Sequence, residues 1–308
     1  MRPIFIACVL FGAACSTDSE VRPAFSVQSD TVTIMPGEEI TKCFYFHTPN
    51  SQPLAINKWV SNMTPGSHHM IFFTGGLEHA DGIDDNVCGL NLTNGIAGLQ
   101  SWVFAAQTPH SELLLPANDG TGKPIAQLLQ PNMQAAFQMH YLNSSDKPLE
   151  ASVKLEAYAL SEGSEYTLTA PYITYNFDIS IPPQAKGVTS TASCDAPPGK
   201  FWQITTHAHK QAVATEVKDG NSMMFQSTDW EHPGRAVWDT SPFYPVESGK
   251  VTWTCTYDNI GDNANRTVVQ GPSAQTNEMC MAVGSYFPAQ GARVCRVKNG
   301  DCACIDLP

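Results

Sequence analysis

The chain has 308 residues, of which 42% are hydrophobic and 15% charged, so it holds enough apolar material for two domains of ordinary size. Its formal net charge is −12, and its 17 Lys and Arg residues form no cluster. Because nucleic acids and anionic membrane surfaces attract concentrated positive charge, this balance excludes both as electrostatic partners.

The first residues are typical of a secretion signal. One Arg precedes an apolar stretch from Ile4 to Ala14, which is too short to span a bilayer, and small residues precede Cys15. The same pattern suggests a bacterial lipoprotein signal with Cys15 acylated, although the usual Leu three places earlier is absent. We expect removal of residues 1–14 and export to the periplasm, to the outer membrane as a lipoprotein, or to the outside. Membrane contact would come only through this lipid.

From residue 24 onward, short segments rich in β-branched and aromatic residues alternate with turn residues. Examples are the segments 25–34, 152–160, 166–175, 201–217 and 249–258. The pattern predicts an all-β fold of sandwiches or jelly rolls, with a domain boundary at about residue 170. The two domains would cover residues 24–169 and 170–308.

Two segments within this β-rich chain favour short helices instead. They are "GIAGLQSWVF" at 95–104 and "PIAQLLQ" at 124–130. Neither is long enough to organise a domain.

Eight cysteines remain for pairing after Cys15, and in an oxidising compartment we expect disulfides. In "CRVKNGDCAC", a two-residue turn at Asn299-Gly300 sets Cys295 opposite Cys304, within disulfide reach. Cys302 would then pair further away, for example with Cys194. An irregular tail with a different pairing is the alternative.

Two histidine pairs are candidate metal ligands. In "TPGSHHM", His68 and His69 are adjacent, and neighbouring side chains on a regular strand point to opposite faces, so an incidental pair is the alternative. In "TTHAHK", His207 and His209 are two apart and share one face of a strand, which is the spacing of a bidentate metal grip. A solvent-facing pair is the alternative there.

Each pair is followed by a third donor at the same distance. His140 in "FQMHYLN" lies 72 residues after His68, and Met279 in "NEMC" lies 72 residues after His207. This spacing predicts two similar domains with one metal each. Three histidines suit zinc, copper or nickel, whereas two histidines with a thioether favour copper(I).

Together, "PGSHHM", "FQMHYLN", "THAHK", "FYPVESGKVTWTCTYDN" and "NEMC" resemble the copper type II, ascorbate-dependent monooxygenase family, which includes peptide-amidating enzymes. The resemblance runs from about Thr31 to Cys295. It implies two antiparallel jelly-roll domains in tandem, stapled by disulfides, with one copper each across an open cleft.

The resemblance also assigns residues. It implies that His68, His69 and His140 hold an electron-transfer copper, the adjacent pair binding at a bend through the ring nitrogens nearer the backbone. His207, His209 and Met279 would be the catalytic set, holding the copper that meets dioxygen. The implied disulfides join Cys43 to Cys88, Cys255 to Cys280, and Cys194 to a cysteine after the Met segment, such as Cys295. The last pair conflicts with the hairpin register, and the choice stays open.

The implied reaction is a monooxygenase reaction that inserts one oxygen atom into a C–H bond of a small-molecule substrate. It would use two copper ions, dioxygen, and ascorbate or another one-electron reductant. Peptide-amidating members hold a peptide carboxylate with an Arg, an Asn and a Tyr where this chain has Thr205, Met281 and Val283. We therefore expect a substrate smaller or more apolar than a peptidylglycine.

Two alternatives are an exported copper-binding or copper-shuttling protein, and a structural module with incidental histidines. The remaining histidines, His47, His79, His110 and His232, are predicted to be surface or loop residues. Of these, His232 in "WEHPG" has the best claim to border a substrate cleft.

Overall fold

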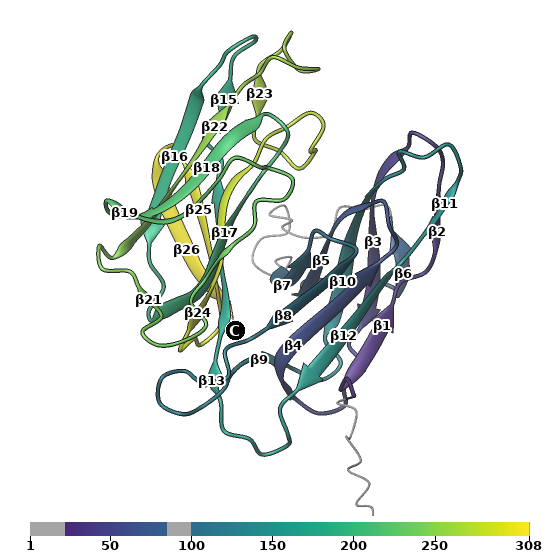
Figure 1. The fold of residues 1–308 in the computed structure, drawn as a ribbon, viewed down its shortest axis with the longest axis vertical. Coiled ribbons are helices and arrows are strands. Elements are labelled where there is room, and N and C mark those ends of the chain that lie inside the picture. Colours follow the sequence, from purple (N-terminus) through teal and green to yellow (C-terminus); the bar gives the residue numbers. More distant parts are fainter. Residues whose placement is uncertain (1–21, 85–99, 308) are drawn as a thin grey trace, which may run out of the picture.

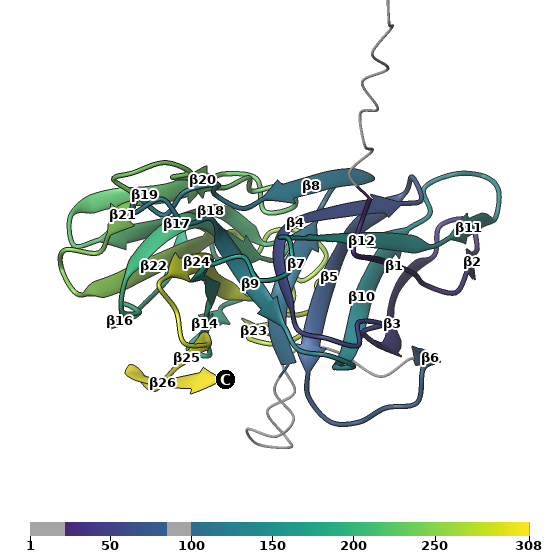
Figure 2. The ribbon, with the colours of Figure 1, turned by 90° about the horizontal axis from the view of Figure 1, so that it is seen from below.

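The computed structural model describes residues 22–84 and 100–307, and the regular elements in those ranges are all β-strands. Figure 1 shows two halves lying side by side, each made of stacked sheets, and Figure 2 shows the same separation from below. The all-β prediction is confirmed. None of the described segments forms a helix of the length and hydrophobicity that a membrane span needs.

The first half contains a six-stranded sheet packed on a five-stranded sheet. The six-stranded sheet has the order β1-β12-β4-β9-β13, with β8 also paired to β4, and the five-stranded sheet has the order β6-β3-β10-β5-β7. A small ribbon joins β2 to β11. The bounds are β1 Phe25–Gln28, β2 Val32–Ile34, β3 Glu39–His47, β4 Leu54–Met63, β5 Ser67–Gly75, β6 Gly82–Asp84, β7 Gln100–Ala106, β8 His110–Leu114, β9 Ile125–Leu129, β10 Gln134–Leu142, β11 Leu149–Ala151, β12 Val153–Ala159 and β13 Thr167–Leu168.

The second half contains a seven-stranded sheet packed on a four-stranded sheet. The larger has the order β20-β17-β24-β14-β25-β26, with β21 also on β17, and the smaller has the order β16-β22-β18-β19. A second ribbon joins β15 to β23. The bounds are β14 Ala170–Asn176, β15 Ser180–Ile181, β16 Val188–Asp195, β17 Lys200–Ala208, β18 Ala212–Asp219, β19 Ser222–Ser227, β20 Ala236–Val237, β21 Tyr244–Pro245, β22 Lys250–Tyr257, β23 Val268–Val269, β24 Cys280–Phe287, β25 Ala292–Lys298 and β26 Asp301–Leu307.

The chain passes from one half to the other at Thr169. β13 ends at Leu168 in a sheet of the first half, and β14 begins at Ala170 in a sheet of the second. The Thr169 hydroxyl donates to the Tyr286 carbonyl at 2.8 Å and accepts from the Trp202 indole N–H at 2.8 Å. These bonds fix the crossover to the second half.

Strand alternation sets which side chains form the core. In β22, Val251, Trp253, Cys255 and Tyr257 are buried, and the residues between them face the other way. Because only one face of this sheet meets the opposing sheet, the period of two in the sequence is enough to place these residues inside.

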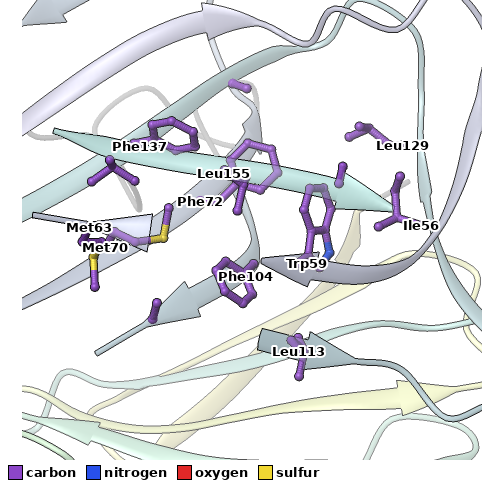
Figure 3. Close-up of a cluster of buried hydrophobic side chains, with 14 of the residues drawn as sticks. Ile56, Trp59, Met63, Met70, Phe72, Phe104, Leu113, Leu129, Phe137 and Leu155 are labelled. Atoms are coloured by element: carbon purple, nitrogen blue, oxygen red, sulfur yellow. The ribbon is translucent and has the colours of Figure 1, made fainter. Parts of the chain in front are cut away.

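The core of the first half is aromatic. Figure 3 shows Trp59, Phe72 and Phe137 packed between the sheets, and the Trp59 and Phe72 rings lie 5.3 Å apart. Trp202, Phe243 and Phe287 from the second half belong to the same buried cluster. The two sandwiches therefore share apolar packing where they meet.

The two helical predictions are wrong wherever the structure describes them. Residues 125–129 form β9, which pairs with β4 and β13, and buried Gln127 accepts the Trp59 indole N–H at 2.6 Å. Residues 100–104 belong to β7, and residues 95–99 lie outside the described ranges. Pairing with distant strands overrides the local helical preference in both cases.

Three disulfides join cysteines that are both described: Cys194 to Cys302, Cys255 to Cys280, and Cys295 to Cys304. Asn299 and Gly300 have φ of 55° and 78°, as a two-residue hairpin turn requires, and the ladder sets Cys295 opposite Cys304. The hairpin prediction is confirmed, and the alternative that joins Cys194 to Cys295 is wrong because Cys295 is already paired.

The other predicted cysteine roles fall partly outside the described residues. Cys43 is buried and disulfide-bonded, and its predicted partner Cys88 lies outside those residues. Residues 1–14 and Cys15 lie outside them too. The disulfides are consistent with an exported protein, because such bonds persist in oxidising compartments.

Candidate metal centres

The first predicted ligand set lies on two neighbouring antiparallel strands. His69 in β5 is directly opposite His140 in β10, and their ring centroids are 5.0 Å apart. The pairing then steps from His69 to Ser67, so a β-bulge falls at His68. A bulge bends the strand and re-aims side chains, which is the irregularity that an adjacent pair needs to share a metal. The side chain of His68 lies outside the described part of the structure.

Glu39 orients the imidazole of His140. His140 is buried, and its Nε2 lies 2.6 Å from Oε1 of Glu39. If His140 holds a metal, it does so through Nδ1, because Nε2 is hydrogen-bonded to the carboxylate of Glu39. A carboxylate behind a ligating imidazole is the usual arrangement that fixes ring orientation and raises the basicity of the ligand.

The second predicted set lies on another antiparallel pair, β17 and β24. His207 is near the end of β17, His209 follows it, and their ring centroids are 5.3 Å apart. Nδ1 of His209 lies 3.1 Å from the Asn277 carbonyl oxygen. Because a carbonyl only accepts, Nδ1 carries the hydrogen in this bond and Nε2 holds the lone pair that a metal would need.

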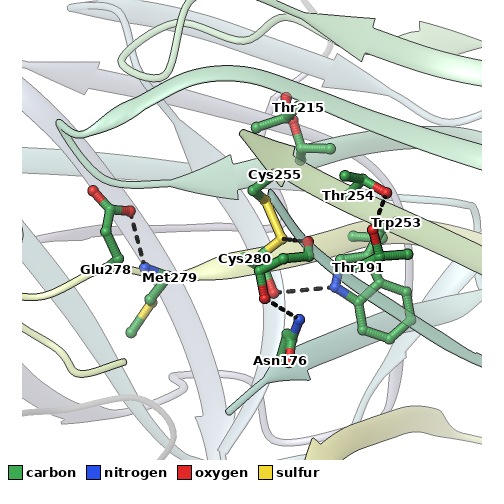
Figure 4. Close-up of a disulfide and its surroundings, with 12 residues drawn as sticks. Asn176, Thr191, Thr215, Trp253, Thr254, Cys255, Glu278, Met279 and Cys280 are labelled. Carbon is green, nitrogen blue, oxygen red and sulfur yellow. Dashed lines mark hydrogen bonds between the residues drawn. A yellow bond between two sulfur atoms is a disulfide. The ribbon is translucent and has the colours of Figure 1, made fainter. Parts of the chain in front are cut away.

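The strand register of β17 and β24 leads toward Met279. His207 is opposite Met281 and Ala208 is opposite Cys280, so the same register continued by one residue sets Met279 opposite His209. Met279 is partly buried and packs against the apolar cluster that includes Met281, Val283 and Trp102. Figure 4 shows its thioether extending away from the Cys255–Cys280 disulfide. That disulfide ties Cys280, the residue after Met279, to Cys255 on β22.

Glu278 connects the two segments that carry His209 and Met279. Its fully buried carboxylate accepts backbone N–H bonds from His209 at 2.9 Å, Gln211 at 2.7 Å and Met279 at 3.2 Å. Burial raises the pKa of Glu278 to about 7, against the opposing effect of these three bonds. Sequence reasoning missed this residue, although its position beside Met279 in "NEMC" was a signal.

The two sets face each other across the junction between the halves. The ring centroids of His69 and His207 are 6.5 Å apart, and Trp102 of β7 lies 6.3 Å from His207. The resemblance implied an open cleft between the centres. The structure instead brings one histidine of each set close together.

A cavity of about 280 Å³ opens beside this contact and is lined from both halves. His69, Trp102, His207 and Val283 line it, and so does the loop His232–Arg235. His232, the residue expected to border a substrate cleft, therefore borders this cavity. The other histidines outside the ligand sets lie elsewhere: His47 bonds Glu78 and Asp81, His79 stacks on Tyr45, and His110 bonds Asn62.

The donor chemistry of these residues fits copper. One set offers imidazole nitrogens, and the other offers two imidazoles, with the thioether of Met279 on the residue before β24. A further cluster of potential ligand atoms comprises Cys194, Cys295, Cys302 and Cys304, whose sulfurs lie within 4.8 Å of one another. Disulfides occupy all four, so this cluster is no metal site.

No family model matches the chain, and no curated protein matches it either. Among solved structures it is similar to PNGase F, a glycosylasparaginase from Flavobacterium meningosepticum, with 9% identity, coverage of 92% of this chain and 99% of the other, and a TM-score of 0.35. A peptide-N(4)-(N-acetyl-beta-D-glucosaminyl) asparagine amidase gives 12% identity, coverage of 85% and 96%, and a TM-score of 0.34. A cryo-EM structure of broad bean stain virus gives 7% identity, coverage of 94% of this chain and 100% of the other, and a TM-score of 0.29. Similarity at this level carries no argument about function.

Proposed function

We propose that this protein is an exported copper-dependent monooxygenase that hydroxylates a C–H bond of a small organic substrate, with dioxygen and a one-electron reductant such as ascorbate. The observation that carries the proposal is the approach of one histidine from each predicted ligand set beside one cavity. His69 opposes His140 on one strand pair, His207 lies near the end of β17 with His209 just after it, and the rings of His69 and His207 are 6.5 Å apart.

Each donor set has partners that prepare it to bind copper. The carboxylate of Glu39 is hydrogen-bonded to Nε2 of His140, and the Asn277 carbonyl accepts a hydrogen bond from Nδ1 of His209. Glu278 ties the backbone of His209 to that of Met279. These bonds fix the ring orientations of His140 and His209 and the backbone at Met279 before any ion arrives, which reduces the entropy lost on binding.

The different donor atoms of the two sets support different roles for the two proposed copper centres. Copper bound at these positions supplies redox chemistry with dioxygen that no side chain of the protein can perform. The thioether of Met279 would favour the reduced ion at its centre, whereas an all-imidazole set suits both oxidation states. Were each set to hold copper, the close approach of His69 and His207 would shorten the path for one-electron exchange between the two ions. Trp102 and Val283 give the cavity apolar walls, which limit the access of water to the reacting atoms.

Export to the periplasm or the outside is part of the proposal. The disulfides support it, and acylation of Cys15 would hold the protein on a membrane surface.

Copper analysis provides the first test. We expect two copper ions per wild-type chain and one in M279A or H207A. M223A is the matched control, because Met223 is exposed and lies outside both donor sets, and it should keep two ions. Wild-type protein that binds no copper would exclude the proposal.

Oxygen uptake separates an enzyme from a copper carrier. Copper-loaded protein with ascorbate is incubated with ¹⁸O-labelled dioxygen and a pool of small metabolites, and products are identified by mass spectrometry. A labelled hydroxylated product that H207A does not form supports the monooxygenase. Tight stoichiometric copper binding with no labelled product supports the shuttling alternative.

A further inference from the structure

The cavity between the halves has a charge opposite to that of the whole protein. The chain carries a formal net charge of −12, yet none of the described residues lining the cavity is Asp or Glu. Its ionisable lining residues are His69, His207, His232 and Arg235. A site with cationic and imidazole groups and no carboxylate attracts anions and repels cations.

Arg235 is the permanent charge in this cavity. Its Nη1 donates to Oε1 of Gln203 at 3.2 Å, and it forms no ion pair with a carboxylate within the described ranges. The residue is exposed, so a ligand can reach it, while the protein around the guanidinium removes enough water to lower its pKa. A guanidinium in this setting has donors available for a bidentate oxyanion.

The segment that carries Arg235 is fixed to the strand that carries His207. Ala236 in β20 is opposite Ile204 in β17, and the Thr205 hydroxyl donates to the Gly234 carbonyl. The guanidinium therefore sits beside the strand leading to His207, and both residues line one cavity. A ligand bound to Arg235 would extend toward the imidazoles.

The remaining walls are largely apolar. Ile71, Trp102, Leu113 and Val283 contribute hydrocarbon or aromatic surface, and the volume of about 280 Å³ is at the small end for ligand pockets. A ligand with an apolar body and one anionic end fits this combination. A multiply charged ligand would leave charged groups unpaired, and a large ligand would not enter the cavity.

We propose that Arg235 binds the carboxylate of a small organic acid whose apolar body lies against Trp102 and Val283. This site names the substrate class of the monooxygenase proposed above, and in that respect it rests on the proposed function. Binding of the acid itself needs no copper and can be measured separately.

The test compares isosteric acids and amides. Phenylacetate, phenylacetamide, hexanoate and hexanamide are titrated into the full chain prepared without copper, and dissociation constants are measured by calorimetry. We expect at least one acid to bind roughly 10- to 100-fold more tightly than its amide, the range expected for hydrogen bonds to a charged group. R235Q should abolish this preference, and R235K should keep part of it.

R296Q is the matched control, because Arg296 is exposed and does not line the cavity. It removes the same charge and should keep the preference of the wild type. Equal binding of acids and amides, or a preference that survives in R235Q, would overturn the proposal. So would inorganic phosphate binding that R235Q abolishes while neither acid is preferred. Copper content, measured on the same preparations after loading, reports separately on the proposed function and should stay at two ions in R235Q.

Discussion

The imidazole rings of His69 and His207 lie 6.5 Å apart and nearly perpendicular, although one belongs to β5 of the first sandwich and the other to β17 of the second. Their approach depends on how the two sandwiches are held together. A hydrogen-bonded chain crosses the same junction, because Gln275 of the second half donates to Glu39, and Glu39 bonds His140. The first candidate centre is therefore hydrogen-bonded to the second half.

Glu39→Gln should weaken copper binding at the first centre. The amide cannot replace the charged acceptor behind His140, and loss of such a partner typically lowers metal affinity about 10- to 100-fold. Competition with a calibrated chelator measures the affinity of each ion. Glu162→Gln makes the same charge change at an exposed position and should have no effect. Unchanged affinity in E39Q would mean that the carboxylate does not orient a ligand.

Trp202→Phe should loosen the junction between the halves. It keeps most of the aromatic volume but removes the buried N–H that bonds Thr169, a loss of about 1–3 kcal/mol in the free energy of unfolding. Trp202→Ala should cost more, about 3–5 kcal/mol, because it leaves a cavity in the shared cluster. Urea unfolding measures both. Equal midpoints for W202F and wild type would contradict the role given to this bond.

Removal of the Cys255–Cys280 disulfide should affect the second centre specifically. In C255A/C280A we expect the free energy of unfolding to fall by about 3 kcal/mol, because the disulfide closes a loop between residues separated by 25 positions. We also expect weaker copper binding beside Met279. The matched control is C295A/C304A, which removes a disulfide from the terminal hairpin and should lower stability while keeping two ions. Loss of one ion in the control and not in C255A/C280A would reverse this interpretation.

Gly199→Ala should be strongly destabilising for two reasons. The residue has φ of +116°, and an added Cβ would lie 2.4 Å from the Phe287 carbonyl oxygen. Gly163→Ala separates the two effects, because φ is +77° there but nothing lies within 4 Å of the added atom. We expect G163A to cost about 1 kcal/mol from backbone strain and G199A to cost clearly more. Thermal unfolding of the two variants gives the comparison.

Asp219 should make stability depend on acid pH. Burial alone would raise its pKa, but hydrogen bonds from Ser248 and the backbone N–H of Glu247 outweigh burial and lower it below 3.8. Its stabilising contribution is therefore complete above about pH 4 and is lost as the pH falls through the lower folded-state pKa. The stability difference between wild type and D219N should be largest near neutral pH and shrink below pH 4. A constant difference from pH 7 to pH 2 would contradict this.

Local patterns in the sequence predicted much of the fold. The alternation in β22 and the Asn299-Gly300 turn each depend on a few neighbouring residues, so strand faces and the Cys295–Cys304 pair follow from geometry alone. The segment at 124–130 failed because its strand state depends on β4 and β13, which are distant in sequence.

The candidate centres were predictable only in part. The donors stand in recognisable spacing, but Glu39 and Arg235 take their roles from partners and surfaces that only the folded chain assembles. Nothing in the sequence around Arg235 distinguishes it from an ordinary surface arginine. The close approach of His69 to His207 likewise follows from how the sandwiches dock, which no local pattern encodes.

The presence of Phe287 in the buried cluster of the first sandwich has a consequence for biosynthesis. A nascent chain that has emerged from the ribosome only as far as residue 169 lacks Phe243 and Phe287, so its first sandwich leaves apolar surface uncovered. Proteins usually fold domain by domain from the N-terminus. Here the buried cluster of the early half stays incomplete until β24, the third strand from the end, has been synthesised.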